Sequence, residues 1–122
     1  MMAMYFDKEG NELPDTKAWG KLFEDKTYQV VQQDTLTVEG REVFVSTVWL
    51  GLDHGFGMGG PPVIFETMIF AEGGTDGEYQ WRYSTLEQAQ EGHLNALSLA
   101  PALMTQDLIE VRSKAAGRKE EE

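Results

Sequence analysis

The hydrophobic residues lie in several segments of the chain, and their spacing within each segment distinguishes strands from helices. Residues 27–38 and 41–52 are rich in β-branched and aromatic residues, and Glu39-Gly40 between them is typical of a hairpin turn. The second segment alternates two sets of side chains that are both mostly apolar, which predicts a central strand covered on both faces. The two sets are Val43, Val45, Thr47 and Trp49 on one face, and Phe44, Ser46, Val48 and Leu50 on the other.

Two further strands are expected downstream of a glycine-rich loop. Residues 63–70 again carry apolar side chains on both faces, with Glu66 among them. Residues 78–84 alternate aromatic and polar side chains, which predicts one buried face and one face in water. The aromatic set is Tyr79, Trp81 and Tyr83.

Helical spacing occurs before and after these strands. Asp15 can cap a short helix whose apolar stripe is Trp19, Leu22 and Phe23. Ser84 and Glu87 form a capping box that predicts a longer helix ending near Leu99, since Pro101 follows. Its inner face would carry Leu86, Ala89, His93 and Leu97, whereas the segment after Thr105 fits a helix or a strand.

These elements predict an α+β fold. A four-stranded antiparallel meander sheet would be packed by one long capped helix, with the short N-terminal helix nearby. Residues 1–116 would form a single domain and residues 117–122 a charged C-terminal tail.

Composition and charge narrow the function classes. The chain has 122 residues, of which 41% are hydrophobic and 25% charged, as in soluble globular proteins. Its net charge of −11 repels nucleic acid and anionic membranes and favours a basic protein partner. Cysteine is absent, which excludes disulfides and thiol chemistry. With no signal peptide and no long apolar run, we expect a cytoplasmic protein without a membrane segment.

Three stretches carry a resemblance to known sequences. They are VSTVWLGLDHGFG, GPPVIFETMIF and WRYSTLEQAQEGH, which together span roughly residues 45–93. The chain resembles a family of small uncharacterised proteins encoded by bacteriophages and by actinobacteria. The resemblance implies a phage accessory role, in the host cytoplasm, and brings no activity or site residues with it.

The glycine-rich loop is the first candidate site. Asp53 and His54 lie at its base, Phe56 and Met58 at its tip, and Trp49 in the strand before it. A phosphate-binding loop would need a Lys or a following helix, and here Pro61-Pro62 and a strand follow instead. The glycines and apolar tip favour a recognition loop that contacts a partner.

A buried polar pair is the second candidate. Glu66 and His93 each lie on an apolar face, one of a strand and one of a helix. Because a buried carboxylate needs a partner, we expect these two side chains to be buried and paired with each other.

The sequence therefore favours a non-enzymatic protein-binding protein, of the kind that inhibits a host system. It would self-associate, most simply as a homodimer, because its two-sided apolar strands outnumber the helices that could cover them. One alternative is a nucleotide-like small molecule held between the loop, Trp49 and Trp81. A less favoured one is a metal-dependent hydrolase using Asp53, His54 and Glu66. No cofactor or resident metal is expected.

Overall fold

The fold is a four-stranded antiparallel meander in the order β1-β2-β3-β4. The structure is a computed structural model that describes residues 4–55, 59–72 and 79–121, with side chains as far as Thr105. The strands are β1 (Val30–Val38), β2 (Arg41–Trp49), β3 (Phe65–Ala71) and β4 (Tyr79–Tyr83).

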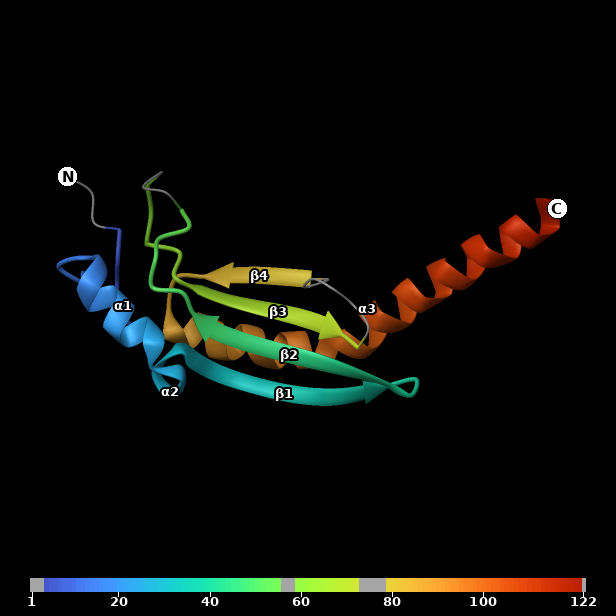
Figure 1. Ribbon diagram of the computed structural model, residues 1–122, viewed down its shortest axis with the longest axis horizontal. Coiled ribbons are helices and arrows are strands. Elements are labelled where there is room, and N and C mark those ends of the chain that lie inside the picture. Colours follow the sequence, from blue (N-terminus) through green and yellow to red (C-terminus); the bar gives the residue numbers. More distant parts are fainter. Residues whose placement is uncertain (1–3, 56–58, 73–78, 122) are drawn as a thin grey trace.

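In the described part of the chain, three helices accompany the sheet. They are α1 (Thr16–Glu24), α2 (Lys26–Gln29) and α3 (Leu86–Glu121). The first half of α3 runs behind the sheet and covers that face, whereas α1 and α2 lie at one end of it (Figure 1). The predicted α+β architecture is therefore confirmed. No described helix is long and apolar enough to cross a membrane.

The hairpin between β1 and β2 closes as the sequence predicts. Glu39 and Gly40 have φ angles of 51° and 80°. Positive φ at both central residues is the mark of a type I′ turn, whose twist matches that of the two strands. The turn fixes the register, with Val38 opposite Arg41.

Helix α3 begins one residue later than the capping box predicted. Thr85, rather than Ser84, is the N-cap, because its Oγ1 accepts from the backbone N–H of Gln88 at 3.0 Å. Gln88, rather than Glu87, reciprocates by accepting from the N–H groups of Ser84 and Thr85. The box is thus the same motif shifted by one position.

The predicted end of this helix near Leu99 is wrong. The helix continues through Pro101, and its later part projects past the end of the sheet (Figure 1). Pro101 is exposed, whereas Ala100 and Met104 on either side of it are buried against the sheet. Burial on both sides of the proline offsets the backbone hydrogen bond that its missing N–H removes. The helix also absorbs most of the predicted charged tail, residues 117–121.

The core lies between α3 and the sheet in two clusters. One centres on Val43, Val45 and Ile69 and receives Ala96 and Ala100 of α3. The other centres on Trp49 and Phe65 at the end nearer α1. Of the two sets of side chains on β2, the set Val43, Val45, Thr47 and Trp49 faces α3, and all four are buried.

The expectation that β2 is covered on both faces is wrong. Only the α3 side is covered, and no described element lies over the opposite face, which is turned toward the viewer in Figure 1. Apolar residues occur on both sides of β2, but the chain supplies one long helix and places it on one side. We call the uncovered side the open face.

Candidate binding surface

The open face carries several apolar side chains that are only partly covered. Phe44 in the middle of β2 is 38% exposed, and Val48, Met68 and Phe70 are partly buried. A shallow hollow on this face is lined by Gln33, Thr35, Phe44, Ser46 and Phe70, among others. An apolar patch with a polar rim is typical of surfaces that contact another macromolecule.

One ion pair lies on the same face. Arg82 on β4 stands opposite Glu66 on β3, and its Nε donates to Glu66 Oε2 at 2.9 Å. Glu66 is nearly buried, whereas the Arg82 side chain is 40% exposed. The carboxylate is thus neutralised locally, and the remaining guanidinium surface is presented to solvent.

The predicted pairing of Glu66 with His93 is wrong, although both side chains are buried as expected. Successive side chains in a strand point to opposite faces. Thr67 faces α3 and is fully buried, so Glu66 next to it faces the other way, toward Arg82. His93 lies on the α3 side, and the sheet separates the two residues.

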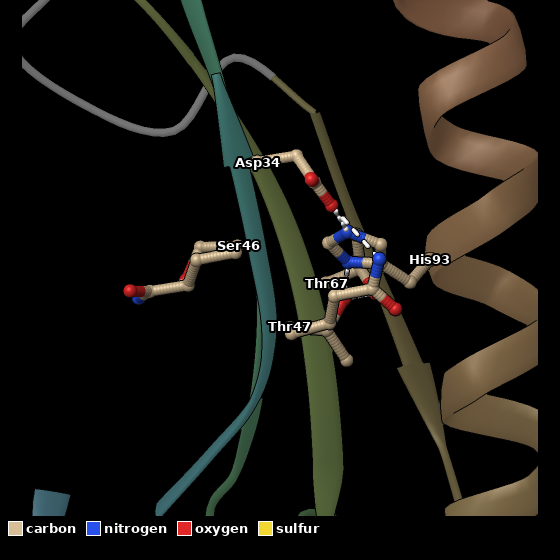
Figure 2. Close-up of polar contacts among 7 residues, drawn as sticks. Asp34, Ser46, Thr47, Thr67 and His93 are labelled. Carbon is tan, nitrogen blue, oxygen red and sulfur yellow. Dashed lines mark hydrogen bonds and ion pairs between the residues drawn. The ribbon is translucent and has the colours of Figure 1, made fainter. Parts of the chain in front are cut away.

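His93 instead organises a hydrogen-bonded network between α3 and the sheet (Figure 2). Its Nε2 lies 2.7 Å from Asp34 Oδ2 on β1, and its Nδ1 lies 2.7 Å from Thr47 Oγ1 on β2. Thr47 Oγ1 is 2.6 Å from Thr67 Oγ1 on β3. One helical side chain therefore connects three adjacent strands.

The order carboxylate, imidazole, hydroxyl is also that of a hydrolytic triad. Thr47 would be the nucleophile, but its side chain has no exposed surface, and neither has that of His93. A substrate cannot reach the hydroxyl without separating α3 from the sheet. The geometry of the network serves to fix α3 on the sheet.

Asp34 is the member of this network that the sequence pattern did not reveal. The hydrogen bond from His93, followed by one from Gln32, lowers the pKa of its carboxyl. The side chain is 39% exposed, so it connects the buried imidazole to solvent. The sequence did contain a signal that Asp34 has a specific partner. Aspartate is rare within strands, and Asp34 occupies an inward position two residues before Leu36.

The base of the glycine-rich loop is held by Asp53. Its Oδ1 accepts from the N–H groups of Gly55 and Val63, at 2.8 and 2.9 Å. His54 Nδ1 lies 2.8 Å from the Leu52 carbonyl oxygen, and the His54 N–H donates to the Val63 carbonyl. Both residues therefore shape the loop, and a role in binding remains a prediction.

The three remaining predicted contact residues are Trp49, Phe56 and Met58. Phe56 and Met58 lie outside the described residues. Trp49 has no exposed surface, and its Nε1 donates to the Phe6 carbonyl at 3.0 Å. Its place in a binding surface is therefore contradicted. Trp81 packs against the other core cluster, so the two indoles do not form a ligand sandwich.

Within the described part of the chain, no three His, Asp or Glu side chains come close enough together to hold a metal ion. Glu66, which the hydrolase alternative requires, lies on the open face and is bonded to Arg82 rather than to Asp53 or His54.

Comparison with protein-family models, with curated proteins and with solved structures found no match for this chain. The resemblance to phage and actinobacterial proteins therefore stays a prediction.

Proposed function

We propose that this protein is a non-enzymatic binding module that uses its open face to contact another protein. The observation that supports this best is the exposure of Phe44 at the centre of that face, beside partly buried Met68 and Phe70. Large apolar side chains cost free energy in water, at about 25 cal/mol for each Å². A partner that covers them recovers this energy.

The charge of the sheet region favours a basic partner. Residues 30–83, from the start of β1 to the end of β4, contain eight acidic residues and two basic residues, Arg41 and Arg82, a net charge of −6. Such a surface steers a basic partner toward the face and repels acidic ones. The same negative charge repels nucleic acid, as the sequence analysis predicts.

The residues that could take part in a reaction are hydrogen-bonded to other groups or buried. Asp53 accepts two loop amides, and the hydroxyl of Thr47 is buried under α3. A protein that acts by covering a surface of its partner does not need Asp53 or Thr47 to react. Inhibition of a host system, which the sequence analysis favours, is a function of this kind.

The test is affinity capture with paired variants. Phe44→Glu places a charge in the centre of the open face, whereas Leu94→Glu does the same on α3, where Leu94 is 59% exposed. Extracts of the natural host are passed over each variant and over the wild type, and bound proteins are quantified by mass spectrometry. We expect a protein that binds wild type and Leu94→Glu and loses at least tenfold on Phe44→Glu. Equal capture by all three would contradict the proposal.

A further inference from the structure

The open face by itself is small for a stable complex. Four strands about 4.8 Å apart and about seven residues long, at about 3.3 Å each, span roughly 450 Å². A standard interface buries about 800 Å² on each partner. A partner that also covers the adjoining edge of the sheet would enlarge this interface and add hydrogen bonds to it.

We propose that the partner binds through an extended basic segment that pairs with β1 and lengthens the sheet by one strand. This inference rests on the proposed function and adds its mode of recognition. Strand addition supplies main-chain hydrogen bonds for affinity and places alternate side chains over the open face.

The pairing pattern shows which backbone groups of β1 are available. In an antiparallel pair, residues alternate between bonding to one neighbouring strand and to the other. The N–H of Glu72 donates to the Glu42 carbonyl, so even-numbered residues of β2 bond toward β3 and odd-numbered ones toward β1. The odd-numbered residues of β2 stand opposite Asp34, Leu36 and Val38.

The intervening residues of β1 therefore direct their N–H and C=O groups away from the sheet. These are Gln33, Thr35 and Thr37. The two-residue turn leads to the same assignment, because the residues that flank a type I′ turn bond to each other. All three residues are exposed to solvent.

This edge also lacks most of the features that block strand addition. Proteins protect exposed edges with proline, lysine, bulges, inward-pointing charges or covering elements. The one inward charge on this part of β1, Asp34, is bonded to His93. Between Gln33 and Val38 there is no proline, lysine or arginine, and the register is continuous. The irregularity between Val30 and Gln32 limits the usable edge to about six residues. The opposite edge, β4, has five residues and presents Arg82.

Charge selects the occupant. Glu39 in the turn and Glu42 on β2 lie beside this edge, as does the base Arg41, whereas the Asp34 carboxylate lies on the α3 side and is bonded to His93 and Gln32. A second copy of this chain would bring the same acidic residues against them, which is unfavourable. A basic strand has the complementary charge, and an apolar side chain next to Thr35 would enter the hollow beside Phe44.

The test uses a randomised ten-residue peptide library displayed on a surface and selected on the whole protein. We expect the selected peptides to be basic, with alternating apolar residues. The best one is then resynthesised with single N-methyl groups at successive positions. An N-methyl group removes one donor, so strand addition predicts an alternating pattern, with at least tenfold weaker binding at every second position and little change between them. This readout leaves the protein unaltered and needs no variant to fold.

Amide hydrogen exchange gives the matching readout on the protein. The N–H groups of Thr35 and Thr37 should exchange quickly in the free protein and at least tenfold more slowly with the peptide bound. The N–H groups of Asp34 and Leu36 are slow in both states and serve as the control.

Other results would overturn the inference. A library that yields no binder, or binders without the alternating N-methyl pattern, excludes strand addition. If those binders still lose affinity for Phe44→Glu, the open face remains the binding surface and only the mode is wrong. If they do not, the proposed function fails as well. Protection of Thr35 and Thr37 in concentrated protein without peptide would identify a second copy, and not a basic segment, as the occupant.

Discussion

The two threonines of the His93 network offer a sharp test of how α3 is held on the sheet. Thr47→Val and Thr67→Val are the same chemical change at two fully buried positions on neighbouring strands. Any gain from replacing a hydroxyl by a methyl group is therefore similar in both and cancels in their difference. What remains is the effect on the hydrogen bonds of His93.

The two variants should differ in stability by a predictable amount. Thr47→Val leaves His93 Nδ1 and the Thr67 hydroxyl without the contacts they make at 2.7 and 2.6 Å, whereas Thr67→Val leaves Thr47 bonded to the imidazole. A buried polar group without a partner costs about 1–3 kcal/mol, whereas one lost hydrogen bond costs about 1 kcal/mol. We expect Thr47→Val to cost about 2–4 kcal/mol and Thr67→Val about 1 kcal/mol.

Urea unfolding at neutral pH, followed by tryptophan fluorescence, measures both free energies. Domains of this size are stable by about 5–15 kcal/mol, so both variants should remain folded. Each kcal/mol should also lower the melting temperature by roughly 3–5 °C. Equal effects, or a larger effect for Thr67→Val, would refute the assignment of Thr47 as the residue that holds the imidazole.

Three further predictions follow from charges. Because folding lowers the pKa of the Asp34 carboxyl, this group stabilises the folded state above the usual pKa of 3.8, and the stabilisation is lost as the pH falls through the lowered pKa. Acid unfolding curves of Asp34→Asn should lose that part of the pH dependence. An unchanged pH dependence in this variant would contradict the prediction. Arg82→Met leaves the nearly buried Glu66 carboxylate unpaired and should lower the free energy of unfolding in urea by about 1–3 kcal/mol. The control variant Gln80→Met, on the same strand, should leave this free energy nearly unchanged. Equal losses in the two variants would show that the ion pair contributes nothing. Self-association, which the uncovered apolar strands predict, should strengthen with added salt, because salt screens the repulsion between two chains of net charge −11. A mass of 13.7 kDa from sedimentation, at every salt concentration and at micromolar protein concentrations, would rule self-association out.

Much of the fold was readable from the sequence because local chemistry and the alternation of apolar residues agree. Glu39-Gly40 places positive φ where a type I′ turn needs it, and Asp15 caps α1 by accepting from the Ala18 N–H. The errors occurred where tertiary packing overrides a local signal. Pro101 is tolerated inside α3 because Ala100 and Met104 are buried beside it.

The candidate site was less predictable, since it depends on which face of the sheet receives α3. Both faces of β2 and β3 are apolar, so the sequence could not say whether Glu66 or Thr67 would meet His93. The register settles this, because Thr67 stands opposite Thr47 beneath the helix and Glu66 opposite Arg82. The partner of His93 was Asp34, 59 residues away in the chain, a distance that no local pattern spans.

The central claim, that the open face is the working surface, is tested most directly by hydroxyl-radical footprinting of the complex with a partner captured through wild-type protein. The radicals oxidise exposed Phe, Met and Leu side chains, so both faces are read in one experiment. We predict that Phe44 and Met68 become protected on binding, whereas Leu94 and Leu99 on α3, 59% and 47% exposed, stay as reactive as in the free protein. Protection of Leu94 and Leu99 with unchanged oxidation of Phe44 would contradict the account.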